Sequence, residues 1–313
     1  MRILIAGGAG FIGTNFTRQA VNRPDVELVV VIDSLTYAGR SDNVDEISRF
    51  FQVDIGDSEL VLRIINDQKI DTIVNFAAES HVDRSLVDVS PFLETNILGT
   101  IKLLEAAIHA SIPRFLHVST DEVYGSLIDE FASESFPLNP GNPYSASKAA
   151  ADSFVLAYAN TYNLPAVITR CCNNYGPYQI PEKLVPLFIS KALANESMPL
   201  YGSGTNVREW IHVNDHCRAI WHVLNMIPFP KGQVFNIGTG VQVSNRDMAE
   251  IICELSGASK RLITTVVDRK GHDFRYALDS RKLRKTGWFP IISLDYGMEQ
   301  TIQWYKLNHG RYS

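Results

Sequence analysis

Cysteine is scarce in this sequence of 313 residues, and long apolar runs are missing. Only four cysteines occur, and none belongs to a Cys-x-x-Cys pair, so we expect reduced thiols in place of a disulfide framework. No apolar run approaches the roughly 18 residues that cross a bilayer. The first residues lack the apolar core and cleavage site of a signal peptide. We therefore expect a cytoplasmic protein.

An excess of positive charge is also missing. The 29 Lys and Arg residues stand against 34 Asp and Glu residues, which gives a formal net charge of −5 at pH 7. This balance favours neither nucleic acid nor an anionic membrane as a partner. Apolar residues make up 45% and charged residues 20%, which excludes disorder or coiled coil as a description of the whole chain.

Short β-branched runs alternate with amphipathic stretches through the first half of the chain. Runs that barely alternate are typical of strands buried on both faces of a parallel sheet. Their order predicts an α/β fold with a Rossmann-type doubly wound sheet. The runs cover residues 3–6, 28–32, 72–76, 115–118 and 166–169. After them glycine and proline cluster, so we expect one domain over 1–169, with later segments folding back on it, and a smaller mixed α/β lobe over 170–313.

A glycine-rich turn follows the first predicted strand. Gly7, Gly10 and Gly13 have the spacing G-x-x-G-x-x-G, which lets backbone N–H groups approach a pyrophosphate at the start of a helix. Asp33 ends the next strand, where a carboxylate would bind the adenosine ribose hydroxyls and repel a 2′-phosphate. The pattern predicts NAD as the cofactor and residues 1–169 as its domain. The alternative is a glycine turn that binds no ligand.

Two later strand ends extend this prediction. Asp54 and Ile55 would frame the adenine ring, and Ala77 and Ala78 offer small side chains where a cofactor passes closely. Each pair is equally compatible with a simple strand end. Their regular placement at the carboxyl ends of successive strands favours the cofactor interpretation.

Tyr144 and Lys148 stand four residues apart in a predicted helix, so they share one face. The usual pKa of tyrosine is near 10, which makes it a poor base at pH 7. A nearby ammonium and a cationic nicotinamide would favour the phenolate and lower that pKa. Tyr144 would then remove a hydroxyl proton while hydride leaves the same carbon. Surface helices also carry this pair by chance, but the upstream cofactor turn favours the catalytic interpretation.

Two adjacent carboxylates, Asp121 and Glu122, follow the predicted strand at 115–118. Neighbours on a regular strand face opposite sides, so both reach one site only if the chain bends there. Thr120 precedes them and would align a substrate hydroxyl against Tyr144. The structural alternative is a capping box made by Ser119 and Glu122, which would start a short helix without a catalytic role.

These motifs together resemble the extended short-chain dehydrogenase/reductases of the NAD-dependent epimerase/dehydratase family, and more narrowly the dTDP-glucose 4,6-dehydratases. The matching stretches run over nearly the whole chain. The glycine turn and the Tyr-x-x-x-Lys motif are shared by the whole group. The Thr-Asp-Glu triplet at 120–122 and the stretch Glu-Ser-His-Val-Asp-Arg-Ser at 79–85 are far more specific.

The resemblance implies a lyase that uses NAD without net redox change. NAD⁺ oxidises C4 of dTDP-glucose, water is eliminated across C5 and C6, and hydride returns to C6 to give dTDP-4-keto-6-deoxyglucose. The resemblance assigns the base to Tyr144, its tuning to Lys148 and the positioning of the hydroxyl to Thr120. Glu122 would remove the C5 proton and Asp121 would protonate the departing hydroxyl, so we expect burial to raise the pKa of Asp121.

Further positions follow from the resemblance one by one. The cofactor would contact Gly7, Gly10, Phe11, Ile12, Gly13, Asp33, Ser34, Leu35, Thr36, Asp54, Ile55, Phe76, Ala77, Ala78, Ser80, Thr95, Tyr144, Lys148 and Asn173. The nucleotide-diphosphate sugar would contact Ser80, Thr120, Asn174, Lys183, Leu184, Pro199, Leu200, Tyr201, Arg208, Asn245 and His272, which places it mainly in the 170–313 lobe. Arg208 suits a diphosphate because a guanidinium binds phosphate oxygens in pairs. No Glu or Cys completes a metal site with His212 and His216, so we expect no metal.

Two other functions share parts of these motifs. A UDP-sugar 4-epimerase or a UDP-glucuronate decarboxylase would need NAD, Tyr144 and Lys148 but not the carboxylate pair. A non-catalytic NAD-binding sensor would need none of the catalytic side chains. The helical stretches 91–110 and 143–163 look apolar on more than one face, and the resemblance implies that they form the four-helix interface of a homodimer.

Overall fold

The largest sheet has seven parallel strands. The structure is a computed structural model that describes residues 1–44, 46–268 and 271–311. The strands follow the order β10-β6-β5-β4-β1-β2-β3. Their bounds are Arg2–Ala6 (β1), Leu28–Asp33 (β2), Arg49–Gln52 (β3), Thr72–Asn75 (β4), Arg114–Thr120 (β5), Ala166–Cys171 (β6) and Val234–Ile237 (β10). The predicted Rossmann-type sheet is confirmed.

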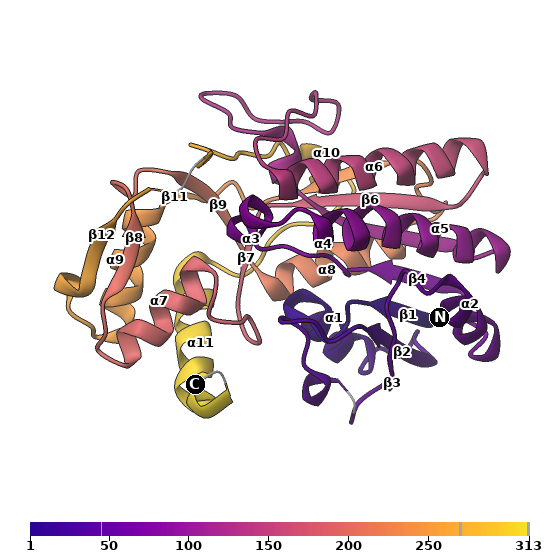
Figure 1. Cartoon of the computed structure of the whole chain (residues 1–313), viewed down its shortest axis with the longest axis horizontal. Helices are drawn as coiled ribbons and strands as arrows, with labels where there is room; N and C mark the ends of the chain where they lie inside the picture. Colours follow the sequence, from indigo (N-terminus) through magenta and orange to yellow (C-terminus); the bar gives the residue numbers. More distant parts are fainter. Residues whose placement is uncertain (45, 269–270, 312–313) are drawn as a thin grey trace.

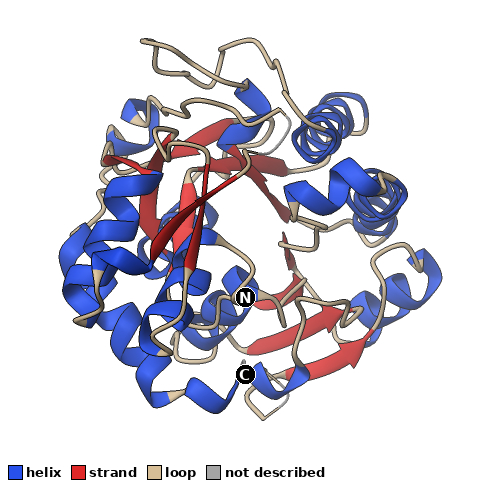
Figure 2. Ribbon diagram, turned by 60° about the vertical axis from the view of Figure 1, so that its left-hand side comes forward, coloured by secondary structure: helices blue, strands red, loops and turns tan. Residues whose placement is uncertain are grey.

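Helices cover both faces of this sheet (Figures 1 and 2). In β1, Ile3 and Ile5 join one apolar core while Leu4 and Ala6 join another, because successive side chains on a strand point to opposite faces. Both faces are therefore buried, which explains the unbroken apolar run. The first core is closed by α1 (Phe11–Ala20) and α8 (Val213–Leu224), and the second by α2 (Ser58–Asp67), α5 (Thr100–His109) and α6 (Pro143–Thr161).

The second half of the chain adds two small sheets and a third core. One sheet contains β7 (Asn173–Tyr175), β9 (Val207–His212) and β11 (Gln242–Ser244), and the other pairs β8 (Met198–Tyr201) with β12 (Ile263–Val266). The third core is enclosed by α7 (Leu184–Leu193), α9 (Asn245–Ser256) and α11 (Leu294–Leu307). These elements lie on the left of Figure 1. Strand β10 returns to the large sheet, while β6 crosses the predicted boundary at residue 169.

Short helical segments complete the chain. They are η1 (Ser41–Asn43), α3 (Val82–Val87), α4 (Ser90–Phe92), the π-helical η2 (Leu93–Gly99), η3 (Asp121–Tyr124), η4 (Lys260–Leu262), α10 (Arg281–Arg284) and η5 (His309–Arg311). Within the ranges that the structure describes, none of the helices combines the length and the apolar character needed to cross a bilayer.

Candidate active site

A cleft of about 500 Å³ lies between the large sheet and the two small ones. Its first wall consists of segments that follow β1, β4, β5 and β6, together with the first turns of α6. Its second wall comes from the segment before α7, from β8 and β9, and from the chain around residues 272–276. Because the carboxyl ends of parallel strands meet at one edge of a sheet, residues far apart in the sequence converge there.

The glycine turn fits closely against the next strand end. Gly7 has φ +72°, and a Cβ on it would lie 2.5 Å from the backbone nitrogen of Ala77. A Cβ on Gly13 would lie 2.2 Å from the Gly7 carbonyl oxygen. These glycines therefore let β1, the turn and α1 approach each other, and α1 begins at Phe11 without a side-chain cap on its first N–H groups. The first N–H groups of a helix are a ready donor set for a pyrophosphate.

Asp33 is buried at the end of β2 and supports this turn. Its Oδ2 accepts a hydrogen bond from the Ala9 backbone N–H at 3.0 Å, and its Oδ1 accepts one from the Leu35 N–H at 2.9 Å. Burial raises the pKa of this carboxyl. The contacts fix the carboxylate beside the turn, and each oxygen has a second lone pair for a ribose hydroxyl.

The short helix η3 brings Thr120, Asp121 and Glu122 into the cleft. Thr120 Oγ1 accepts a hydrogen bond from the Glu122 N–H at 3.2 Å and lies 3.2 Å from Asp121 Oδ1. The predicted bend is therefore real, but Thr120 makes the cap that the structural alternative assigned to Ser119. The bend lets both neighbouring carboxylates line the same cleft, which a regular strand does not allow.

The two carboxylates have different surroundings. Asp121 is buried, and desolvation together with the nearby Glu122 and Glu209 raises its pKa well above the usual value, as the sequence predicted. Its Oδ2 has no hydrogen-bond partner among the described residues. Glu122 is half-buried, and its Oε2 accepts a hydrogen bond from the Tyr276 hydroxyl at 3.5 Å. Asp121 is thus suited to hold a proton, and Glu122 stands closer to solvent.

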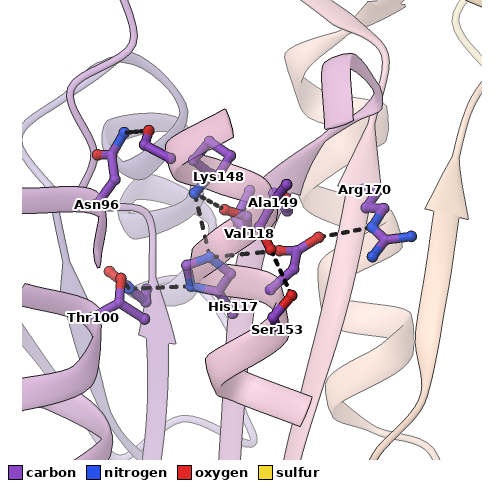
Figure 3. A network of polar contacts seen from close by, with 12 residues as sticks. Asn96, Thr100, His117, Val118, Lys148, Ala149, Ser153 and Arg170 are labelled. Carbon is purple, nitrogen blue, oxygen red and sulfur yellow. Dashed lines mark hydrogen bonds and ion pairs between the residues drawn. The ribbon is translucent and has the colours of Figure 1, made fainter. Parts of the chain in front are cut away.

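Tyr144 and Lys148 lie in the first turns of α6. Asn142 caps this helix by accepting from the Ser145 N–H at 2.9 Å, while Ser145 Oγ accepts from the Asn142 N–H at 3.2 Å. Lys148 Nζ donates to the Val118 carbonyl at 2.8 Å and lies 3.3 Å from His117 Nε2 (Figure 3). The cap and these contacts direct both side chains to the end of β5.

The protein groups around Tyr144 raise its pKa. Burial and the neighbouring Glu122 raise it well above its usual value, and a hydrogen bond with Thr120 opposes the shift. Burial also lowers the pKa of Lys148 to about 8. The chain alone therefore holds the phenol in its protonated form, and the predicted lowering needs a positive charge from a bound group.

The second wall is held by contacts between distant segments. Arg208 donates to the carbonyls of Val207 and Phe274, and also to that of Asp273 at 2.9 Å, and its guanidinium stacks 4.4 Å from the Tyr276 ring centroid. Lys183 Nζ donates to the Ser80 carbonyl at 2.7 Å. The basic groups of this wall are thus fixed before any ligand is present.

Most of the predicted site residues come together in the cleft. It is lined by Gly7, Gly10, Phe11, Ile12, Gly13, Phe76, Ala78, Ser80, Thr120, Asp121, Glu122, Tyr144, Lys148, Asn173, Asn174, Lys183, Leu184, Pro199, Leu200, Tyr201, Arg208, Asn245 and His272. Among the described residues, the lining does not include Asp33, Ser34, Leu35, Thr36, Asp54, Ile55, Ala77 or Thr95. Ile55 is a core residue packed under Gly99, and Asp54 is exposed.

Two residues of this region were not predicted. Tyr276 contacts Glu122 from a segment 154 residues away, and no local motif indicates such a contact. His117 lies inside an apolar run of β5, which predicts burial but not a partner for Lys148. The two histidines that were considered for a metal site have structural contacts. His216 Nδ1 lies 2.9 Å from Asn174 Oδ1, and His212 Nδ1 accepts a hydrogen bond from the Asn214 N–H at 3.2 Å.

An NAD molecule suits the first wall on structural grounds. The glycine cradle has no space for a Cβ at Gly7 or Gly13, and Asn173 Oδ1 is a buried oxygen without a hydrogen-bond partner in the described chain. These features are those of a surface shaped for a polar, extended ligand.

Comparison with known proteins gives the family. A family model described as GDP-mannose 4,6 dehydratase matches residues 4–301. The chain belongs to this family. The low-salt glycan biosynthesis protein Agl12 of Haloferax volcanii is 50% identical over 97% of this chain and 98% of its own length. A dTDP-glucose 4,6-dehydratase of Streptomyces niveus is 45% identical over 98% of this chain and 94% of its own length.

A solved structure extends the comparison to three dimensions. DesIV, a dTDP-glucose 4,6-dehydratase from Streptomyces venezuelae that was crystallised with NAD and dTDP, has a TM-score of 0.96 and 48% identity with this chain. The match covers 100% of this chain and 99% of DesIV. The resemblance inferred from the sequence motifs is confirmed, and it extends over the complete fold of this family member.

Proposed function

We propose that this protein converts dTDP-glucose to dTDP-4-keto-6-deoxyglucose and water, with NAD as a cofactor that is regenerated in each turnover. The observation that carries this proposal is the convergence of four groups in one cleft: Asp121, Glu122, Tyr144 and Lys148. Elimination of water needs a base at C5 and an acid at the C6 hydroxyl, in addition to a base at the C4 hydroxyl. Relatives named for this reaction match the chain over nearly its full length.

The cofactor would lie along the first wall, with its pyrophosphate at the start of α1 and its adenosine ribose at Asp33. Phe76, Ala78 and Ser80 would follow the nicotinamide half, and Asn173 would contribute its free oxygen. When bound, NAD⁺ supplies the oxidant at C4, the reductant at C6 and a positive charge beside the phenol of Tyr144. Asp54 and Ile55, which follow β3, and Thr95 in η2 lie outside the cleft lining and stay predicted cofactor contacts.

Tyr144 would take the proton of the C4 hydroxyl while Thr120 holds that hydroxyl in line. Its own burial works against the phenolate, so the Lys148 ammonium and a second positive charge are needed to stabilise it. The ketone that forms at C4 makes the C5 hydrogen acidic. This ordering explains why the site needs its carboxylates only after oxidation.

Glu122 and Asp121 would then act as a base and an acid on the same substrate. Glu122 is the more exposed member and accepts the C5 proton, whereas the buried Asp121 retains the proton that the departing hydroxyl needs. Environments that separate the proton affinities of two neighbouring carboxyls are a recurring way to divide these roles. A 4-epimerase reaction needs neither group, so the pair favours the dehydratase over that alternative.

The second wall would bind the nucleotide diphosphate. Arg208 and Lys183 offer positive charge, and Asn174, Leu184, Asn245, His272 and the segment Pro199–Leu200–Tyr201 surround the remaining space. A fixed guanidinium loses little conformational entropy on binding. The 170–313 lobe is therefore proposed as the mainly substrate-binding part, and 1–169 as the NAD-binding part.

Substitution of Glu122 by Gln tests the assignment. The variant, incubated with dTDP-glucose, is expected to reduce its bound NAD, seen as the near-ultraviolet absorbance of reduced nicotinamide, and to form no 4-keto-6-deoxy product. Glu130→Gln is a matched control, since Glu130 is exposed in the loop after η3 and lies outside the cleft lining. Normal turnover by Glu122→Gln would overturn the assigned roles.

We also propose a homodimer formed through the segment from α4 to α5 and through α6. Leu93, Leu98 and Phe154 are exposed on these helices at 44%, 56% and 39%, and exposed apolar patches of this kind mark interaction surfaces. Light scattering at micromolar concentration should give twice the chain mass of 35.0 kDa. A monomer would contradict the proposal. A cytoplasmic location stays a prediction.

A further inference from the structure

A buried chain of polar groups lies behind Lys148 and takes no part in the mechanism above. It runs from Asn75 on β4 through His117 on β5 to Asp152 on α6 and Arg170 on β6 (Figure 3). His117 is completely buried, and Asp152 is 1% exposed. Polar groups are costly to bury unless their hydrogen bonds are specific, so their protonation states follow from their partners.

Asn75 determines which nitrogen of His117 carries the proton. Its Oδ1 accepts a hydrogen bond from the Ala77 N–H at 3.0 Å, which fixes the amide orientation. Its Nδ2 group therefore faces His117 Nδ1, 3.2 Å away. An amide N–H only donates, so Nδ1 must be the acceptor, and a neutral imidazole then carries its proton on Nε2.

One described side chain lies within hydrogen-bond distance of His117 Nε2. Lys148 Nζ lies 3.3 Å from Nε2, whereas Asp152 Oδ1, at 3.9 Å, is too far away for a hydrogen bond. A lysine nitrogen accepts a hydrogen bond only as a neutral amine, because an ammonium has donors alone. A charged Lys148 leaves the Nε2–H without an acceptor within hydrogen-bond distance among the described residues.

We propose that His117 is a positioning residue that donates its Nε2–H to Lys148 when the lysine is a neutral amine, and so favours the amine over the ammonium. Loss of this N–H would favour the ammonium form, because the amine would lose a hydrogen bond. A histidine that only accepts from the Lys148 ammonium would have the opposite effect. The direction of the change therefore separates the two arrangements.

The other charged groups around His117 and Asp152 have contacts of their own. Arg170 Nε donates to Asp152 Oδ2 at 2.8 Å, and its Nη1 donates to the Tyr124 hydroxyl at 2.9 Å. Asp152 and the Cys171 thiol act to raise the pKa of Lys148, while burial lowers it to about 8. Burial and Lys148 keep the pKa of His117 well below its usual value, so the imidazole is neutral. Tyr144 and Lys148 both line the cleft.

The tautomer can be measured directly on the full-length protein. Labelling with ¹⁵N-histidine and recording the ring nitrogen shifts should show a protonated Nε2 and a bare Nδ1 for His117, with His117→Gln identifying the signal. A protonated Nδ1 would overturn the proposal. This measurement does not depend on activity, so it stands even if the proposed function is wrong.

A second test uses the pH dependence of turnover and rests on the proposed function. Wild-type kcat/KM for dTDP-glucose is expected to fall above a pH of about 8, where Lys148 loses its charge. His117→Phe removes the N–H and should move this decline upward by about one pH unit, which equals about a tenfold change in proton affinity. His117→Gln keeps an amide N–H donor near the position of Nε2 and should retain the wild-type profile.

Failure of the His117 proposal and failure of the proposed function would give different results. A downward shift in His117→Phe would overturn the N–H donation to Lys148, whereas wild-type protein that forms no product would overturn the function. If His117→Phe does not fold, the ¹⁵N measurement on the wild type still decides the proposal.

Discussion

The two walls of the cleft are built in different ways. On the first wall, each reactive side chain is placed by its own short segment: the β5 end and η3 place Thr120 and its two neighbours, and the capped start of α6 places Tyr144. On the second wall, the Arg208 guanidinium stacks on the Tyr276 ring and donates to the carbonyl of Asp273, which lies 65 residues away in the sequence. Local geometry positions the chemistry, and long-range contacts position the binding surface.

This difference has a functional consequence. Groups on the first wall touch the reacting carbons in the proposed mechanism, so their loss should reduce kcat. Groups on the second wall would hold the diphosphate, whose binding changes little between ground and transition states, so their loss should raise KM. Substitutions on each wall test whether the division is real.

The largest expected effect is that of Tyr144→Phe on the first wall. Loss of the phenol oxygen removes the base at C4, and kcat should fall about 10³-fold, within the range for general base catalysis. Product formation and cofactor reduction should decline together. Tyr158→Phe is a matched control on the same helix, because Tyr158 packs against Tyr162 away from the cleft. Equal losses in both variants would indicate a structural cause.

Arg208→Met tests the second wall and should have the next largest effect. The substitution removes the positive charge while keeping much of the side-chain volume, and we expect KM for dTDP-glucose to rise about 30-fold, as for a lost charge-assisted hydrogen bond. Steady-state kinetics should show kcat within a few-fold of the wild type. Arg281→Met serves as control, since the Arg281 side chain is 82% exposed and lies outside the cleft lining. A large loss of kcat with unchanged KM would remove the distinction between the walls.

Tyr276→Phe is expected to have a smaller, mixed effect because this residue joins the walls. Its hydroxyl contacts Glu122 on one side and Asp273 on the other. Losing both contacts should lower kcat about fivefold and raise KM to a similar extent, in line with about 1 kcal/mol per bond. Kinetics of the variant at fixed pH measure both changes. An effect on KM alone would place Tyr276 entirely in the binding wall.

The smallest expected effect concerns stability. The folded protein raises the pKa of Asp121 above its ordinary value of 3.8, so the folded state binds this proton more tightly than the unfolded state. The resulting stabilisation is present below pH 3.8 and is lost as the pH rises through the folded-state pKa. Asp121→Asn should therefore be more stable than the wild type by about 1–3 kcal/mol at pH 7.

Urea unfolding at several pH values measures this gain. The difference in the free energy of unfolding between Asp121→Asn and the wild type should widen from about pH 4 toward neutrality. Asn in place of Asp should also abolish product formation. Asp121 would then be a residue that is required for activity but lowers the free energy of unfolding. A difference that stays constant with pH would contradict the raised pKa.

Much of the first wall could be predicted because its signals are local. The G-x-x-G-x-x-G spacing, the four-residue separation of Tyr144 and Lys148, and the unusual pair Asp121–Glu122 are each contained within a short segment. The bend at η3 was also expected, although the cap was assigned to Ser119 and not to Thr120. A one-residue error of this kind is common at helix starts, where either of two neighbouring hydroxyls can accept the same N–H.

The remaining contacts depend on tertiary packing. Tyr276 meets Glu122 across 154 residues, and His117 meets Lys148 across 31, and no spacing rule relates such positions. Burial and Glu122 raise the pKa of Tyr144, while the lowering predicted from the sequence needs a bound nicotinamide and stays a prediction. Those opposing contributions depend on the depth of the cleft, which only the folded structure shows.

The central claim is that hydrogen removed from C4 of the sugar returns to C6 of the same molecule. Turnover of dTDP-glucose that carries deuterium at C4 tests it most directly, with the product examined by mass spectrometry and NMR. The account predicts deuterium in the C6 methyl group. A product whose deuterium is lost to solvent, or remains at C4, would contradict it.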